Sequence, residues 1–240
     1  MYKRQVSFTD RQGLINQTRY TQPCMVAFAA GLTAVLREKG IVPAVAAGLS
    51  LGEYSALHAA GVFDAATAVK LVAFRGKAME EAAAGRESAM VAVLNLDRAP
   101  LQEACDEASD LGCVVICNYN CPGQLVISGS VEAVDAACAK LKEAGAKRAL
   151  RLPVGGAFHS PLMEPAKVEL EKAINEAPFQ APVCPIYQNV DAKPQTDPAT
   201  IKANLIAQLT APVRWTYIVK NMLADGVTEF TELGPGNVLQ

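Results

Sequence analysis

Hydrophobic and polar residues follow helical spacing over most of residues 21–87, with one short apolar interruption. Thr21, Pro23 and Gly40 predict the cap, the first turn and the end of a first helix. A second helix is indicated by "LGEYSALHAAG", and Asp64 predicts the cap of a third, "AATAVKLVAFRGKAMEEAAA". The apolar run "VPAVAAGLS" stands directly before the second helix. This part of the chain therefore predicts a strand, a tight turn and a helix in succession.

The pattern changes over residues 88–152. Strands are indicated by "SAMVAVLNL" and "RALRLPV", and helices by "APLQEACDEASDLG" and "VEAVDAACAKLKEAGAK". Between the helices, "CVVICNYNCPGQLVISGS" predicts a hairpin that turns at Pro122-Gly123. The resulting order β-α-β-β-α-β is that of a ferredoxin-like unit. We therefore expect a small subdomain at 88–152, inserted into a larger one formed by 1–87 and 153–240.

The last part of the chain returns to the first pattern. Ser160-Pro161 and Asp197-Pro198 predict two helix starts, and "VRWTYIVKNMLADG" predicts a helix that ends at Gly226. Strands are indicated by "VCPIYQNV" and "VTEFTEL". Helices that alternate with apolar strands favour a mainly parallel, helix-covered sheet. The expected fold class is α/β, with a hydrolase-like core.

Composition narrows the class of protein. The chain is 51% hydrophobic and 19% charged, which favours a buried globular core, and its net charge of −2 gives no indication of nucleic-acid binding. No apolar run approaches the ~20 residues of a membrane helix, and the N-terminus has no apolar signal region. The seven cysteines are scattered, without Cys-x-x-Cys pairs. We expect buried thiols in a cytoplasmic protein, with no metal and no cofactor.

Candidate chemistry begins with Ser50, which lies in a Gly-x-Ser-x-Gly pattern at the expected strand-to-helix turn. A serine hydroxyl needs a base to become a nucleophile. His58 lies about two turns along the following helix, near ~12 Å away, which favours a structural or surface role. His159, in the glycine-bearing loop "PVGGAFHSPLMEP", is the remaining candidate for the base.

Arg75 interrupts a mostly apolar helical stretch, "KLVAFRGKAME". The plainer interpretation is a surface arginine whose stem covers apolar neighbours. The functional interpretation is a guanidinium fork for a carboxylate. The residues alone favour the plainer interpretation, and they do not select an acceptor that would orient His159.

Several motifs together resemble a known family. The stretches are "GLSLGEYSAL", "RGKAM", "NYNCPGQLVISG", "AFHSPLM", "QLTAPVRW" and "ELGPGNVL". In this order they are similar to the malonyl-CoA:acyl carrier protein transacylases, and the similarity extends from about Phe8 to the end of the chain. It implies a ping-pong transfer of malonyl from malonyl-CoA to the phosphopantetheine thiol of acyl carrier protein in fatty-acid synthesis.

The resemblance also implies roles for particular residues. Ser50 would carry the malonyl group, His159 would act as general base, and Arg75 would pair with the free carboxylate of malonate. The Leu51 N–H would form half of the oxyanion hole. Gln208 matches the family position whose side-chain carbonyl lies near the histidine, so a neutral group would orient the base.

Two departures from the family pattern affect the expectations. Members usually begin with a Gly-Gln-Gly-Ser-Gln motif whose glutamine supplies the second oxyanion donor, and nothing similar precedes residue 46. Since "NVLQ" also resembles an unfinished helix start, we expect a chain shortened at both ends and weakened in activity. The second departure is Leu49, where many relatives carry histidine before the serine.

The resemblance also implies acyl carrier protein as a partner. Acyl carrier protein is acidic as a family, and a candidate basic docking face is formed by Lys140, Lys142, Lys147, Arg148 and Arg151. One alternative function is a serine hydrolase of the α/β type, resembling a thioesterase. Another is a catalytically impaired fragment of the transacylase.

Overall fold

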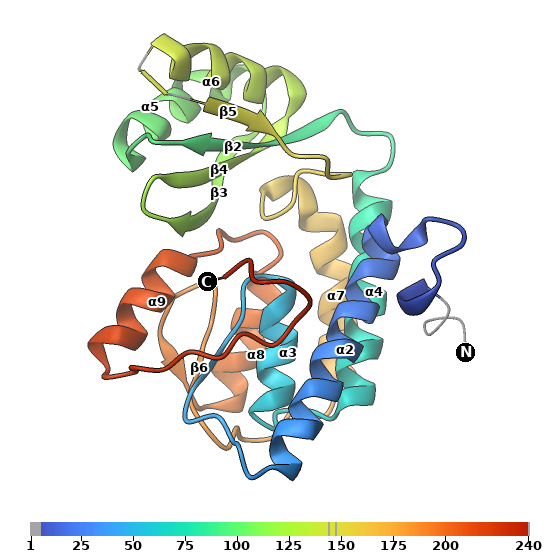
Figure 1. Ribbon diagram of the computed structural model, residues 1–240. Helices are drawn as coiled ribbons and strands as arrows, with labels where there is room; N and C mark the ends of the chain where they lie inside the picture. The colour runs from blue at the N-terminus through green and yellow to red at the C-terminus, as the bar shows by residue number, and fades with distance from the viewer. Residues whose placement is uncertain (1–5, 144, 147, 240) are drawn as a thin grey trace.

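The computed structural model describes residues 6–143, 145–146 and 148–239, in two packed units. The lower unit in Figure 1 is mainly helical. Its helices are α2 (Thr18–Glu38), α3 (Leu51–Ala59), α4 (Ala65–Ala83), α7 (Glu164–Glu176), α8 (Pro198–Ala207) and α9 (Trp215–Ala224), with short 3₁₀ turns η1 (Leu14–Asn16) and η3 (Pro161–Met163). Its small sheet contains β1 (Ala46–Ala47), β6 (Ile186–Tyr187) and β7 (Pro194–Gln195). Strand β6 pairs parallel with β1 and antiparallel with β7.

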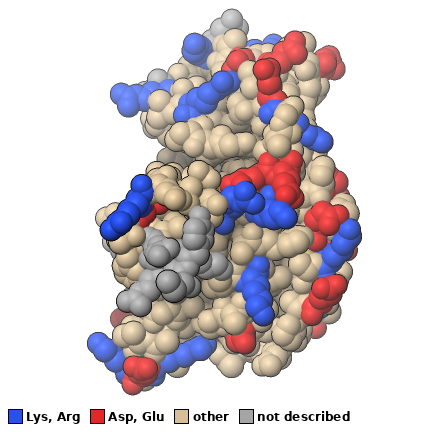
Figure 2. Space-filling view, turned by 90° about the vertical axis from the view of Figure 1, so that its right-hand side faces the viewer, with Lys and Arg blue, Asp and Glu red and all other residues tan. Residues whose placement is uncertain are grey.

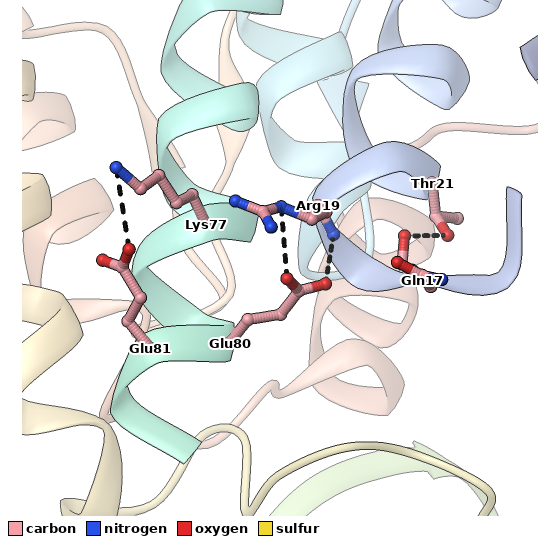
Figure 3. A network of polar contacts seen from close by, with 6 residues as sticks. All are labelled: Gln17, Arg19, Thr21, Lys77, Glu80 and Glu81. Carbon is pink, nitrogen blue, oxygen red and sulfur yellow. Dashed lines mark hydrogen bonds and ion pairs between the residues drawn. The ribbon is translucent and has the colours of Figure 1, made fainter. Parts of the chain in front are cut away.

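Helix α3 lies at the centre of this unit, where Tyr54 and Leu57 are fully buried. Helices α2 and α4 pack against each other beside it (Figure 1). The close approach requires Gly76, because a Cβ there would lie 2.9 Å from the Cα of Arg19. Figure 3 shows the polar contacts at this crossing, where Arg19 binds Glu80 through its main-chain N–H at 2.9 Å and its Nε at 3.3 Å. This packing holds one wall of the site described below.

The upper unit in Figure 1 contains four antiparallel strands and two helices. The elements are β2 (Ser88–Leu94), α5 (Arg98–Ala108), the 3₁₀ turn η2 (Ser109–Leu111), β3 (Val114–Cys121), β4 (Gln124–Ser130), α6 (Val131–Glu143) and β5 (Arg148–Arg151). The spatial order is β3-β4-β2-β5. Both helices pack on one face of the sheet around Leu101, Ile127 and Leu141. The expected hairpin turn at Pro122-Gly123 is confirmed, since Cys121 pairs with Gln124.

The other face of this sheet meets the lower unit. Phe158 packs against Met90 and Val126 of the sheet and against the apolar core around α3 and α4. A main-chain contact joins the units as well. The N–H of Tyr119 donates to the carbonyl of Val213, and the N–H of Val213 donates to the carbonyl of Cys117, both at 2.8 Å. Phe158, directly before His159, and Val213, shortly after Gln208, therefore both contact the four-stranded sheet of the upper unit.

Two expectations about the fold are wrong in detail. The first helix begins at Thr18, so Pro23 lies inside it, and the Thr21 hydroxyl donates to the carbonyl of Gln17 at 3.0 Å instead of capping the helix. Residues 227–233 form no strand, and Phe230 is 52% exposed. A strand needs a neighbour for its N–H and C=O groups, and this segment pairs with none of the described strands.

The surface charges, the cysteines and the helix lengths bear on what the protein could bind. On the face seen in Figure 2, acidic and basic side chains lie next to one another across the middle instead of forming a patch of one sign. The seven cysteines are free thiols, and the described residues contain no cluster of three or more His, Cys, Asp or Glu that could hold a metal ion. No helix in the described ranges is long and apolar enough to cross a membrane.

Candidate active site

Ser50 lies at the turn from β1 into α3, with φ 49° and ψ −101°. This is an unfavourable conformation for a residue with a side chain. The turn is so tight that a Cβ on Gly48 would lie 2.0 Å from the carbonyl carbon of Gly52, which explains the first glycine of the motif. Ser50 occupies the N-cap position, but its side chain makes no capping hydrogen bond. Its hydroxyl therefore projects from the turn and is available for other partners.

His159 is the first partner of that hydroxyl. Its Nε2 lies 2.7 Å from Ser50 Oγ, and its Nδ1 lies 3.0 Å from the main-chain carbonyl oxygen of Gln208. A carbonyl oxygen can only accept a hydrogen bond, so Nδ1 carries the proton in the neutral ring. Nε2 is then left with a lone pair that faces the serine hydroxyl. This geometry suits removal of the hydroxyl proton.

The surroundings keep His159 neutral. The ring is 4% exposed and its residue has a φ of 56°. Burial, together with the positive charge of Arg75, lowers the pKa of His159 to about 4. The imidazole is therefore uncharged at neutral pH and able to accept a proton.

Arg75 reaches the same hydroxyl from α4. Its Nη2 donates to Ser50 Oγ at 3.1 Å and its Nη1 donates to Gln22 Oε1 at 2.9 Å. The side chain is only 1% exposed, so the surface position that the residues alone favoured is wrong. Burial lowers the pKa of its guanidinium. Within the described part of the chain, no carboxylate lies within ion-pair distance of it, and its Nε has no hydrogen-bond partner. A buried cation without a carboxylate partner is suited to binding an anion.

Gln208 follows α8 and is also buried. The family resemblance led us to expect its side-chain carbonyl near His159, but the contact comes from its main-chain carbonyl. The side chain serves other groups: its Nε2 donates to the carbonyl of Ser50 at 3.1 Å, and its Oε1 lies 3.4 Å from Arg75 Nη2. The difference arises because Gln208 lies where the chain leaves α8, so its main-chain oxygen is free to turn toward the ring.

The remaining expected residues lie as follows. Leu51 is the first residue of α3, so its N–H has no acceptor within the helix and lies next to Ser50, at the positive end of the helix dipole. Leu49 is half-buried, and its carbonyl accepts from the Gly52 N–H at 2.9 Å. His58 is buried away from the serine, with Nδ1 3.1 Å from the carbonyl of Phe63. Its structural role was expected.

Sequence reasoning missed two buried polar residues beneath the turn. Asn189 is fully buried and bonds both Ser50 and Gly48 through its side-chain amide. Glu53 is fully buried on α3, accepting from the Asn189 N–H at 2.7 Å and from Gln188 Nε2 at 3.1 Å. Burial raises the pKa of Glu53 to about 7, against the opposing effect of these hydrogen bonds. The polar pair "QN" after an apolar strand was the available signal.

The expected basic face is only partly basic. Lys140 forms an ion pair with Glu107, and Arg151 pairs with Asp135 at 2.9 Å. Lys142 and Arg148 are exposed. Lys147 lies outside the described residues. Paired lysines and arginines contribute less field to a partner, which leaves Lys142 and Arg148 as its main described members.

A serine on a strand-to-helix turn, with a neutral histidine at its hydroxyl, defines the class of enzymes that act through a serine nucleophile. The family model described as "Acyl transferase domain" matches residues 5–240. The chain belongs to this acyl transferase family and is an acyltransferase. The resemblance to the malonyl-CoA:acyl carrier protein transacylases is confirmed by individual relatives.

Individual relatives are similar over most of the chain. It is 46% identical over 226 residues to a malonyl CoA-acyl carrier protein transacylase of Escherichia coli K12, covering 94% of this chain and 73% of that one. A Bacillus subtilis protein of the same name is 42% identical. The crystal structure of an acyl carrier protein S-malonyltransferase from Vibrio cholerae superposes with a TM-score of 0.96 at 44% identity, covering 99% of this chain and 78% of that one.

Proposed function

We propose that this acyltransferase moves a malonyl group from malonyl-CoA to the phosphopantetheine thiol of acyl carrier protein, through a malonyl ester on Ser50. The names of the relatives given above, malonyl CoA-acyl carrier protein transacylase and acyl carrier protein S-malonyltransferase, describe this transfer. The observation that carries the proposal is the position of Ser50 Oγ, 2.7 Å from His159 Nε2 and 3.1 Å from Arg75 Nη2. The serine oxygen thus lies between a base and a buried cation that is able to bind the free carboxylate of malonate.

In the first half-reaction, Ser50 Oγ attacks the thioester carbonyl of malonyl-CoA while His159 Nε2 takes its proton. The tetrahedral oxyanion is stabilised by the Leu51 N–H at the N-terminus of α3. His159 then returns the proton to the sulfur of the departing CoA. The main-chain carbonyl of Gln208 holds the Nδ1 proton throughout, so the ring keeps the tautomer that the reaction requires.

In the second half-reaction, the carrier thiol attacks the malonyl ester and His159 accepts the thiol proton, which it passes to Ser50 Oγ as the ester bond breaks. Arg75 gives selectivity by binding the free carboxylate of malonate through its planar guanidinium. In the structure the guanidinium contacts the serine hydroxyl and two glutamines, which are neutral groups that a carboxylate can replace.

The proposal is tested with malonyl-CoA labelled in the malonyl group, without an acceptor thiol. We expect one stable label on Ser50, which leaves when carrier protein is added. Ser50→Ala should abolish the label, and Ser55→Ala, on the same helix, is the matched control. Rapid release of malonate without a thiol would favour the hydrolase alternative. An unlabelled, folded protein would favour the impaired fragment.

We also infer that the chain consists of a ferredoxin-like subdomain and a hydrolase-like core. The strand order β3-β4-β2-β5 with both helices on one face supports a ferredoxin-like subdomain at 88–152. The parallel pairing of β1 with β6 and the turn at Ser50 support a hydrolase-like core formed by 1–87 and 153–240. The free cysteines support a cytoplasmic location.

The docking of acyl carrier protein is proposed at the basic face, with Lys142 and Arg148 as its main described contributors. A solved complex 40% identical to this chain is described as a type II polyketide acyl carrier protein with its malonyl-transacylase. That match supports a carrier as partner. Charge complementarity to an acidic carrier supports the choice of face.

A further inference from the structure

Asn189 follows β6 and is fully buried beneath the serine turn. Its side-chain Oδ1 accepts from the Ser50 N–H at 2.6 Å, and its Nδ2 donates to the carbonyl of Gly48 at 2.7 Å. One amide group thus bonds the main chain at Ser50 and at Gly48, two residues earlier. Both bonds lie within the turn between β1 and α3.

The main chain of Asn189 is itself held in place. Its N–H donates to Glu53 Oε2 at 2.7 Å, and its carbonyl accepts from the Arg214 N–H at 3.1 Å. Glu53 lies on α3, one turn after Ser50. The side-chain amide is therefore supported from the helix that follows the turn and from the segment that precedes α9.

Ser50 needs such support because its φ of 49° and ψ of −101° are unfavourable. An unfavourable backbone conformation persists only where the surroundings determine it strongly. We propose that Asn189 is a positioning residue, whose two hydrogen bonds hold the Ser50 main chain in the conformation that aims Oγ at His159 Nε2. The catalytic consequence rests on the proposed function, in which Ser50 is the nucleophile.

The proposal requires the chemistry of an amide. Only a group that both donates and accepts can bond the Gly48 carbonyl and the Ser50 N–H together. Leucine has the same shape and makes neither bond. An ionised aspartate keeps the bond to Ser50 but places a carboxylate oxygen against the carbonyl of Gly48.

The experiment measures the rate at which a fluorophosphonate labels Ser50. The Ser50 Oγ–P bond forms, the P–F bond breaks, the proton passes to His159 Nε2, and fluoride leaves. We expect Asn189→Leu to slow labelling about 100-fold, the loss typical of a misplaced reacting atom. Matched controls are Asn221→Leu and Asn221→Asp, because Asn221 Nδ2 donates to the nearby Ala192 carbonyl at 2.8 Å without touching the turn. The controls should label at close to the normal rate.

Asn189→Asp distinguishes the loss of the two hydrogen bonds from a loss of packing, because only the hydrogen bonds depend on the protonation of the new side chain. A protonated aspartic acid donates through its hydroxyl and accepts through its carbonyl oxygen, as asparagine does. The labelling rate of this variant, divided by that of the unsubstituted protein at each pH, should therefore rise as the pH falls from 8 to 5.5.

Several charged groups surround the new carboxyl. Glu53 accepts a hydrogen bond from the Asn189 main chain, and when ionised it raises the pKa of an aspartic acid at position 189 by repulsion. The guanidinium of Arg214 donates to the carbonyl of Val190. Arg75 and His159 contact the Ser50 hydroxyl. Since both proteins contain the same neighbouring groups, dividing one rate by the other at each pH leaves the effect of the substituted side chain.

The inference is overturned if folded Asn189→Leu labels as fast as Asn221→Leu, if the Asn189→Asp ratio is independent of pH, or if the unsubstituted protein does not react at Ser50. Should Asn189→Leu fail to fold, the aspartate ratio decides. The phosphonate carries no malonyl group. Normal labelling without a malonyl-serine would thus contradict the proposed function and leave the role of Asn189 intact.

Discussion

The Nδ1 atom of His159 lies 3.0 Å from the main-chain carbonyl oxygen of Gln208. The group that orients the candidate base is therefore part of the backbone, and no side-chain substitution removes it. The side chain of Gln208 instead joins the Ser50 carbonyl to the guanidinium of Arg75. Substitutions at residues 159 and 208 should consequently have very different effects.

We expect Gln208→Ala to lower the rate of Ser50 malonylation only about tenfold, the equivalent of one or two hydrogen bonds. His159→Ala should lower it by about 10³-fold, because the base itself is lost. Rapid-quench measurement of labelled malonyl-enzyme gives both rates. Equal losses in the two variants would show that the side chain of Gln208, and not its carbonyl, orients the ring.

Arg75 is predicted to select the substrate. Arg75→Met should abolish the preference for malonyl-CoA over acetyl-CoA, measured as the ratio of the two kcat/KM values. It should leave the midpoint of thermal unfolding nearly unchanged, because the cost of losing the hydrogen bonds to Gln22 and Ser50 opposes the gain from removing a buried charge. Among the described residues, that charge has no carboxylate partner. Lys77→Met, at an exposed position on the same helix, is the control. An unchanged preference in Arg75→Met would contradict the assignment.

The depressed pKa of His159 predicts a broad pH range of activity. Because that pKa is about 4, the base stays neutral from pH 8 to about 5, and the rate of malonylation should decline only as the pH approaches 4. Arg75 contributes to the depression, so Arg75→Met should move the acid limb of the profile to higher pH. Pre-steady-state rates between pH 4 and 8 test both points, and an acid limb near pH 6.5 in the unsubstituted protein would refute them.

Glu53 and His159 should have opposite effects on the pH dependence of stability. The pKa of Glu53 is raised from 4.5 to about 7, so its contribution to stability is present below pH 4.5 and is lost as the pH rises through 7. The pKa of His159 is lowered from 6.5 to about 4, so its contribution is present above pH 6.5 and is lost as the pH falls through 4. In the unsubstituted protein the two slopes largely cancel between pH 4.5 and 6.5.

Glu53→Gln should remove one of these slopes. The free energy of unfolding of the variant should fall as the pH is lowered from 6.5 to 4.5, by on the order of 3 kcal/mol relative to its own value at pH 6.5. Denaturant unfolding at several pH values measures the slope, which is independent of any constant cost of the substitution. The same slope in both proteins would show that Glu53 does not titrate in this range.

The proposed carrier face predicts a selective change in KM. Lys142→Glu together with Arg148→Glu should raise KM for acyl carrier protein and leave KM for malonyl-CoA unchanged, since reversed charge repels an acidic partner. Lys39→Glu, at an exposed position after α2, is the control for a charge reversal elsewhere on the surface. A rise in both KM values would place the docking surface elsewhere.

Much of the site could be predicted because its chemistry uses rare residue types. The chain has two histidines, and only His159 is placed to reach the serine. Ser50 was marked by its glycines, whereas the residues alone favoured a surface position for Arg75, and only the family resemblance assigned that buried side chain to the site. By contrast, the main-chain contact of Gln208 and the amide contacts of Asn189 depend on how distant segments meet. No local pattern specifies such contacts.

The fold was predictable to a similar degree. Asp64 caps α4 as expected, accepting from the Thr67 N–H at 2.7 Å, because a cap is a local interaction. Pro23 misled the helix start, since a proline can also lie inside a helix whose packing supports it, as it does in α2. The stretch "VTEFTEL" has the composition of a strand but no described strand beside it. Pairing is a property of the neighbours, and composition does not report it.

The hydrogen bonds that join Val213 to Tyr119 and Cys117 involve only main-chain atoms. Val213 lies five residues after Gln208, whose carbonyl orients His159. The alignment of the base therefore depends on the main-chain register between this segment and β3, and not on particular side chains. Many substitutions between Gln208 and Val213 should therefore be tolerated, whereas inserting or deleting a single residue there should not. Exchange of the four-stranded sheet between relatives should therefore succeed only where the segment from Gln208 to Val213 keeps its length.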